Sequence, residues 1–596
     1  MSGRPTLSPR ARGISAFARL RSLIRGSNFA LSLTGALAGG AAGTMVTVLA
    51  GVAQMAHSLF FGIPLDVRLS AADHIVPWRA IVAPVAGGAL LGLMELWRRR
   101  MGLSAAVDPV EANALRGGRM SLRDSALLTL QTLISNGFGA SVGREAGYTQ
   151  MGGGLASRLG ILLNLRRSDL RVMVGCGAAG AISAAFGAPL CGAFYAFELI
   201  IGVYSVANVA AVTGASLAGF LAAQALIGAP YSIHAPTVGV VEPLHYLVLM
   251  LLGLIACALG IFTMRAVGVV EKLFESTGLP AFARPAAGGV LIGLLALVTP
   301  QVLAAGHGAM KLDLQLDLSW RFLLALIILK LGAAMISLGS GYRGGLFFAS
   351  LFVGALLGKL YGLGAGALFP DLGLDPVACA LTGMGVFAVA VVGGPLTMSF
   401  LVLETTGDYS LTGAVLAACV VTSLTVREVF GYSFSTWRLH LRGETVRSAA
   451  DVGWVRNLTV GRLMRQDPAT LSAQATIAEF RAAYPLGSRH MVVLTDARGV
   501  YQGLVPTAEA FASELDHVAD RRPIVTLARW KEAALSPEMD VKTAMGVFDQ
   551  AEAETLVVVN DQDQGNVVGL LTEAYASRRY AEELDKANRS LTGEDG

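Results

Sequence analysis

Long stretches without a single charged residue limit what this chain can fold into more than any other feature of its sequence. A helix needs about 20 residues to cross the roughly 30 Å hydrocarbon core of a membrane. Each of the following charge-free runs is long enough for at least one crossing: 31–65, 172–197, 199–241, 243–264 and 376–403. Only 15% of the 596 residues are charged, compared with about 25% in soluble proteins. The sequence therefore predicts an all-α, polytopic membrane protein.

Glycine and proline interrupt these runs, as at Phe186-Gly187-Ala188-Pro189 and Val392-Gly393-Gly394-Pro395. We expect the helices to end and restart there, at membrane depth. Such breaks are tolerated only where the freed backbone is buried in protein or lines a cavity. The pattern therefore predicts broken helices around a polar site.

An internal repeat relates the two halves of the apolar region, because 177–198 resembles 383–404. The matching pairs, all at one common offset, are Gly177 with Gly383, Pro189 with Pro395, Leu190 with Leu396 and Glu198 with Glu404. We predict two related halves, about 30–235 and 240–432. Membrane proteins built this way place their substrate site at the interface of the repeats, near the midplane. The repeat thus points to transport.

The ends of the chain differ from its apolar centre. Segment 1–29 is a basic leader, and its arginines are Arg4, Arg10, Arg12, Arg19, Arg21 and Arg25. Positive charge before the first span predicts a cytoplasmic N-terminus. We expect a transmembrane domain over 30–436, a linker over 437–455, a soluble domain over 456–585 and a short tail over 586–596. Four histidines near predicted span ends show no ligand spacing, and we expect them at membrane interfaces: His57, His234, His245 and His307.

The soluble domain is itself repeated, with two amphipathic helices (477–483 and 541–548), each followed by an apolar strand. The pattern resembles tandem CBS domains and predicts a cytoplasmic α/β domain. That resemblance implies an acidic ligand for an adenine nucleotide after each final strand. The matching positions here are Glu509 in the first copy, and Thr572 and Tyr575 in the second. We expect no cofactor, with an adenine nucleotide as the alternative.

A glycine-rich helix start at 143–150 has the form of an anion site, because the first N–H groups of a helix and its dipole attract negative charge. Glu145 is an anomaly there, since an intramembrane carboxylate beside an anion site is costly and suggests function. We interpret it as a tethered competitor that occupies the anion position when ionised and withdraws when protonated. The alternative is a structural ion pair with Arg144 or another cation.

These segments resemble the chloride channel (CLC) family. Its G-[KR]-E-G-P motif corresponds to 143–147, which implies that Glu145 gates the pore and that Arg144, Ala146 and Gly147 lie at the anion. Its G-x-F-x-P motif corresponds to a second segment with anion-binding backbone, Gly345, Leu346 and Phe347. The resemblance implies an inverted-repeat fold with broken helices and a homodimer with one pore in each subunit.

Two hydroxyl ligands of the family are replaced. Ala106 stands in place of the serine of the family's G-S-G-I-P loop, and Ser435 stands in place of the inner-gate tyrosine. Tyr432 or Phe434 lies nearby without the family spacing. Mostly backbone donors remain, which admits a larger, smaller or polyatomic anion in place of chloride.

Coupling to protons also differs from the family pattern. Proton-coupled members carry paired glutamates after the first repeat turn, and this chain keeps Glu198 but has Leu199 next to it. We assign Glu198 to proton coupling through water and interpret its repeat partner Glu404 as a structural helix-end carboxylate. A proton/anion antiporter, a passive channel and a non-transporting sensor read through the CBS pair therefore stay open.

The spans contain neither a nucleophile with a base nor an acidic metal cluster, so we do not expect an enzyme. The expected partners are a small inorganic anion, protons, the lipid bilayer and a second copy of the chain, without nucleic acid. We expect the protein in the bacterial inner membrane, with both termini cytoplasmic.

Overall fold

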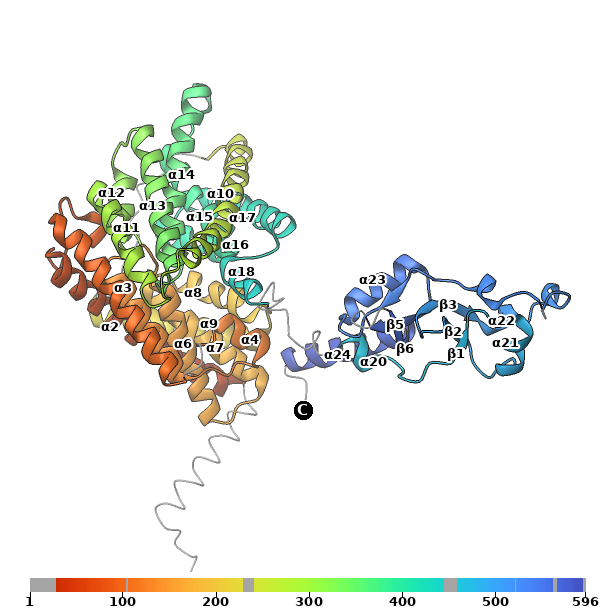
Figure 1. Cartoon of the computed structure of the whole chain (residues 1–596). Coiled ribbons are helices and arrows are strands. Elements are labelled where there is room, and N and C mark those ends of the chain that lie inside the picture. The colour runs from red at the N-terminus through yellow and green to blue at the C-terminus, as the bar shows by residue number, and fades with distance from the viewer. Residues whose placement is uncertain are drawn as a thin grey trace, which may run out of the picture. The chain divides into compact units, whose positions relative to one another are not determined.

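The computed structural model describes residues 28–102, 106–228, 241–443, 458–519, 521–560 and 565–592. The chain forms two compact units, Met1–Asp451 and Val452–Gly596. The first is helical and the second combines helices with two small sheets (Figure 1). Most of the expected N-terminal segment and of the expected linker lies outside the described residues.

The first unit confirms the predicted polytopic helical class. Eight helices in the described part of the chain are long and apolar enough to cross a membrane. The helices of the first half are α2 Asn28–Phe61, α3 Pro77–Arg100, α4 Pro109–Leu115, α5 Leu122–Gly137, α6 Glu145–Leu162, α7 Arg167–Phe186, α8 Pro189–Tyr195 and α9 Val206–Ile227. Those of the second half are α10 Pro243–Ser276, α11 Arg284–Val298, α12 His307–Gln315, α13 Trp320–Ser340, α14 Phe347–Leu368, α15 Pro376–Val392, α16 Pro395–Thr406, α17 Tyr409–Val429 and α18 Phe434–Leu441.

Both predicted helix breaks are confirmed. Helix α7 ends at Gly187 with φ +65°, and α8 begins two residues later with a proline. Helix α15 ends at Gly393 with φ +92°, and α16 begins with Pro395. Glycine adopts the positive φ without a Cβ penalty, and proline suits the first helical turn because its missing N–H has no partner there.

The repeat is visible in how the helices pack. Helix α6 crosses α7 where Gly152 faces Gly177, and α14 crosses α15 where Gly354 faces Gly383. A Cβ at any of these four positions would overlap the carbonyl oxygen of the opposite glycine. The matched glycines of the sequence repeat are therefore explained by two equivalent, very close helix crossings, a common device in membranes.

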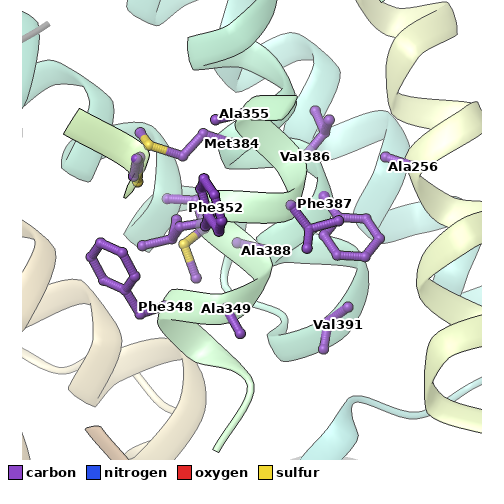
Figure 2. Packing of buried hydrophobic residues seen from close by; sticks show 14 of the residues in the cluster. Ala256, Phe348, Ala349, Phe352, Ala355, Met384, Val386, Phe387, Ala388 and Val391 are labelled. Atoms are coloured by element: carbon purple, nitrogen blue, oxygen red, sulfur yellow. The ribbon is translucent and has the colours of Figure 1, made fainter. Parts of the chain in front are cut away.

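The largest buried apolar cluster joins the second half to the break between α7 and α8. Phe348 and Phe352 of α14 belong to this cluster together with Met384, Phe387 and Val391 of α15 (Figure 2). Phe186, at the end of α7, stacks on Phe348 with ring centroids 6.0 Å apart. The start of α14 is thus fixed by packing against both halves.

The second unit contains two sheets of the same design. In the first, β1 Thr470–Ser472 pairs in parallel with β2 Met491–Thr495, which pairs antiparallel with β3 Tyr501–Pro506. In the second, β4 Ala534–Leu535, β5 Thr555–Asn560 and β6 Asn566–Thr572 repeat this order. The connecting helices are α21 Ile477–Ala483 and α23 Val541–Ala551, as the sequence predicted.

The two copies in this unit interlock. The short helix α20 Val460–Leu463, which precedes the first sheet, packs into the apolar core of the second. A cluster of Val493, Leu504 and Val557 joins the two sheets. The chain therefore has the α/β tandem CBS fold that its pattern predicted. The helix α24 Glu573–Thr592 continues into the expected tail.

Candidate functional site

Two glycine-rich segments from the two halves meet at the candidate site. Gly143 and Gly345 form an isolated antiparallel pair, with N···O distances of 2.8 and 3.2 Å. Each glycine lies two residues before its helix, because α6 begins at Glu145 and α14 at Phe347. An antiparallel contact between equivalent residues is what an inverted repeat produces. The pair brings two helix N-termini together, which concentrates N–H groups and positive dipole ends.

Glu145 lies at this junction and is 2% exposed. Its carboxylate faces the backbone N–H groups of its own residue and of Phe348. It also lies directly against Gly143, because a Cβ there would overlap Glu145 Oε2. A carboxylate is an anion, so the side chain occupies the kind of position that an anion bound at these helix starts would take.

The neighbours of Glu145 bear on the alternative of a structural ion pair. Arg144 extends over the ring of Tyr148, with Cζ 5.9 Å from the centroid. His307 faces the carboxylate instead, with Nε2 3.8 Å from Glu145 Oε1, and its ring stacks on Phe348 at 3.6 Å. His307 was expected at a membrane interface, and the structure places it beside Glu145 instead. No spacing in the sequence connects it to Glu145.

The other residues implied at the anion lie around the same junction. Ala146 and Gly147 form the first turn of α6, where Gly147 packs against Thr132. Leu346 and Phe347 are each 4% exposed. The structure therefore brings together both motif segments, although the anion-binding role of these residues stays a prediction.

The loop with Ala106 reaches the same region. Gln150 of α6 donates to the carbonyl of Val107 at 2.9 Å, and Asp108 caps α4 by accepting from the N–H of Val110 at 2.8 Å. Ala106 and Ala146 share the wall of one cavity. Ala106, which stands in place of the family's serine, therefore lies beside the start of α6.

Ser435 is not brought to the other predicted residues. It is exposed on α18, whereas its neighbours Phe434 and Thr436 are 6% and 3% exposed. Phe434 belongs to the buried cluster that contains Leu346 and Phe347. The phase of α18 therefore turns Phe434 inward and Ser435 outward.

The two repeat glutamates cap each other's half. Glu198, in the π-helical turn 196–201 after α8, accepts from the N–H groups of Leu396 and Thr397 at 3.0 and 2.8 Å, at the start of α16. Glu404, in α16, accepts from Leu190 and Cys191 at 2.7 and 2.9 Å, at the start of α8. The geometry supports the structural role expected of Glu404. Glu198 makes the equivalent backbone contacts and also accepts from Thr397 Oγ1 at 2.7 Å. Its role in proton coupling stays a prediction.

In the second unit the predicted nucleotide ligands lie at strand ends. Glu509 pairs with Arg529 at 3.0 Å, and Thr572 is exposed at the end of β6. The exposed Tyr575 lies one turn into α24. A nucleotide at Glu509 would have to compete with the Arg529 guanidinium, which does not favour the alternative of an adenine nucleotide ligand.

Comparisons with known proteins agree with this geometry. The family model described as voltage gated chloride channel matches residues 87–427. A putative chloride channel protein, ClcB-like, of Ralstonia nicotianae is 31% identical over 361 residues, which is 60% of this chain and 84% of that protein.

Solved structures show the same fold. A slow cyanobacterial Cl⁻/H⁺ antiporter aligns with a TM-score of 0.60 at 19% identity, covering 69% of this chain and 97% of its own. A eukaryotic CLC transporter aligns with a TM-score of 0.58 at 17% identity, covering 94% and 98%. Since the family model spans more than half of the sequence, including both glycine-rich helix starts, this chain belongs to the voltage-gated chloride channel (CLC) family.

Proposed function

We propose that the protein carries a small inorganic anion across the membrane in exchange for protons. The observation that supports this most is the position of Glu145, a buried carboxylate at the junction of two helix N-termini. Dipoles and N–H groups bind an anion without a full buried positive charge, so the ion can also leave. This is the chemistry that a transport site requires.

The same residue supplies the gate. When ionised, Glu145 competes with the transported anion for the N–H groups at the junction. When protonated, it loses its charge, and the anion displaces it. Protonation of Glu145 is therefore linked to the seating of an anion. Exchange in opposite directions requires in addition that the proton reaches Glu145 from the side of the membrane opposite to the one from which the anion enters.

A passive channel is the second candidate, because the Ralstonia relative carries a chloride channel name while the cyanobacterial structure is an antiporter. The two candidates share the anion site and differ only in whether protons move with the anion. A non-transporting sensor would have the same fold but would give no anion flux.

The deciding experiment is anion efflux from proteoliposomes that contain the full chain, with chloride, fluoride, nitrate and bicarbonate tested in turn. A pH dye inside the vesicles reports whether an imposed anion gradient drives protons uphill. Uphill proton movement supports antiport, and flux without it supports a channel. Absence of flux with every anion would contradict both.

Replacement of Glu145 tests the gate. Flux through the parent protein should rise as pH falls, because protonation removes the competing carboxylate. The Glu145→Gln variant resembles the protonated form at every pH and should keep anion flux, lose proton movement and lose most of its pH dependence. Glu275→Gln, which changes a carboxylate ion-paired with Arg284 at 3.5 Å, is the matched control. Equal pH dependence in the parent and Glu145→Gln would refute the gate.

We further propose that the protein is a homodimer in the bacterial inner membrane, with both termini in the cytoplasm. The chloride channel name of the Ralstonia relative supports a location in a bacterial membrane. The basic leader before the first span supports a cytoplasmic N-terminus. Mass measurement of the purified protein in detergent tests the dimer. Labelling, in intact cells, of a cysteine added to the second unit tests on which side of the membrane that unit lies.

A further inference from the structure

A cavity of about 130 Å³ opens beside the anion site and is rich in guanidinium groups. Its wall also contains Ala106, Ala146 and Gly344, which belong to the two helix starts and the altered loop. The charged residues on the wall are Arg98, Arg343, Arg438, Arg442, Asp108 and Asp124. Four guanidinium groups therefore face two carboxylates, which leaves the wall positive.

Part of this charge already has a fixed partner. Arg98 forms two hydrogen bonds with Glu95, at 2.9 and 2.7 Å, which direct its guanidinium to its own helix. Asp108 is engaged by the N–H of Val110 at the start of α4. The environments of Arg343 and Arg438 differ from that of Arg98.

Arg343 and Arg438 line the same cavity from different elements. Arg343 lies in the segment just before α14, where Ser135 Oγ accepts its backbone N–H at 2.9 Å. Arg438 lies on α18, with Cζ 5.9 Å from the Phe434 ring centroid. The two guanidinium groups repel each other, and Arg442 adds to the repulsion of both. Glu271 attracts both groups, Glu95 attracts Arg343 and Asp108 attracts Arg438.

A bound anion between these groups would relieve that repulsion. A guanidinium presents a planar fork of N–H donors that matches two oxygen atoms of one anion, and a charge-assisted bidentate pair is stronger than a single contact. A spherical halide cannot use the fork in this way. The cavity is also larger than the share of liquid volume of one water molecule, about 30 Å³, so it has room for a polyatomic ion.

We propose that the cavity binds a planar oxyanion, of the class of nitrate or bicarbonate, between the forks of Arg343 and Arg438. The cavity wall includes Ala146, the residue after Glu145, so an anion bound in the cavity lies next to the proposed gate. The onward step rests on the proposed transport function, whereas the binding itself does not. Arg343 and Arg438 would then determine which anion is preferred, at a pore that lacks the family's two hydroxyl ligands.

Calorimetric titration of the full chain in detergent with sodium nitrate and, separately, sodium chloride tests the binding. The double variant Arg343→Lys/Arg438→Lys keeps both charges and removes both forks. Nitrate binding should weaken by about tenfold or more, because the bidentate contacts are lost, while chloride binding should change much less. The single variants serve if the double variant does not give a monodisperse protein.

Arg99→Lys is the matched control, because Arg99 ends the same helix as Arg98 but has a side chain that is 62% exposed. It should leave both affinities unchanged. Equal loss of nitrate and chloride binding would show a general electrostatic effect and overturn the proposal, as would unchanged nitrate binding.

Flux from proteoliposomes separates this proposal from the transport function. Fork-dependent nitrate binding without any flux would uphold the site and contradict transport. Flux with a nitrate to chloride ratio that is unchanged in the lysine variants, together with unchanged binding, would uphold transport and contradict the site.

Discussion

At the scale of the residue, the sequence singled out Glu145 but not its neighbour His307. Glu145 could be predicted because glycines flank it and because a carboxylate at a helix start is unusual. His307 could not, since the contact with Glu145 depends on how α12 and α14 pack against the start of α6. Ser435 was chosen by counting residues along a motif, and the phase of α18 turned that side chain outward.

His307 should set the pH at which the gate opens. His307 Nε2 lies 3.8 Å from Glu145 Oε1, and a ring N–H turned toward the carboxylate would favour its ionised form. Burial acts most strongly on the ring, and Arg68, Arg144, Lys330 and His57 also act on it electrostatically. His307→Asn removes this support, so Glu145 should take up its proton at higher pH. The pH of half-maximal flux should rise by about one unit.

The control for this experiment is another buried histidine. His245 is 6% exposed and contacts the carbonyl of Leu372 at 2.7 Å, at the start of α10. His245→Asn should leave the pH profile in place. A profile that His307→Asn does not move would mean that the imidazole only packs on Phe348.

At the scale of the element, helix ends were the most predictable feature. Glycine and proline determine where a helix can stop and start whatever surrounds it, and both breaks lie where the sequence placed them. The partner of each helix end was not predictable. The repeat shows that Glu198 and Glu404 are equivalent, but only the inversion of one half against the other makes each cap the opposite half.

This reciprocal capping predicts structural effects from two substitutions. Glu198→Gln and Glu404→Gln each remove a carboxylate that accepts two backbone N–H groups. A hydrogen bond to a charged group contributes about 1.5–3 kcal/mol, so both variants should melt at lower temperature in detergent. The decrease should be larger for Glu198→Gln, because Glu198 also accepts from Thr397 Oγ1.

The same pair of variants tests proton coupling. If Glu198 also passes protons to Glu145, Glu198→Gln should lose proton movement in proteoliposomes while Glu404→Gln keeps it. Equal proton movement in the two variants would restrict Glu198 to the capping role that the geometry supports.

At the scale of the whole molecule, the sequence separated a membrane part from an α/β part because their compositions differ. It did not show how the two α/β copies depend on each other. The pattern suggested two consecutive domains, yet Val460 and Leu463, which precede the first copy, lie in the core of the second. Such an exchange leaves no periodic trace in a sequence, since a short apolar segment looks the same whichever core it joins.

The interlocking predicts which cuts the second unit tolerates. A fragment that begins at Val452 should fold, because it holds the whole compact unit. A fragment that begins after Arg465 lacks the residues that pair with Leu570 and pack beside Val541. Its second copy should lose stability, although every residue of that copy is present, while the first copy keeps its own core.

Thermal unfolding followed by circular dichroism measures this directly. The longer fragment should melt in one transition, and the shorter one should melt earlier or in two steps. The matched control is the double substitution Val460→Ala/Leu463→Ala in the longer fragment, where deleting buried methyl groups costs about 1 kcal/mol or more at each position. If the shorter fragment melts like the longer one, the second copy is independent of α20, and the two copies are consecutive domains after all.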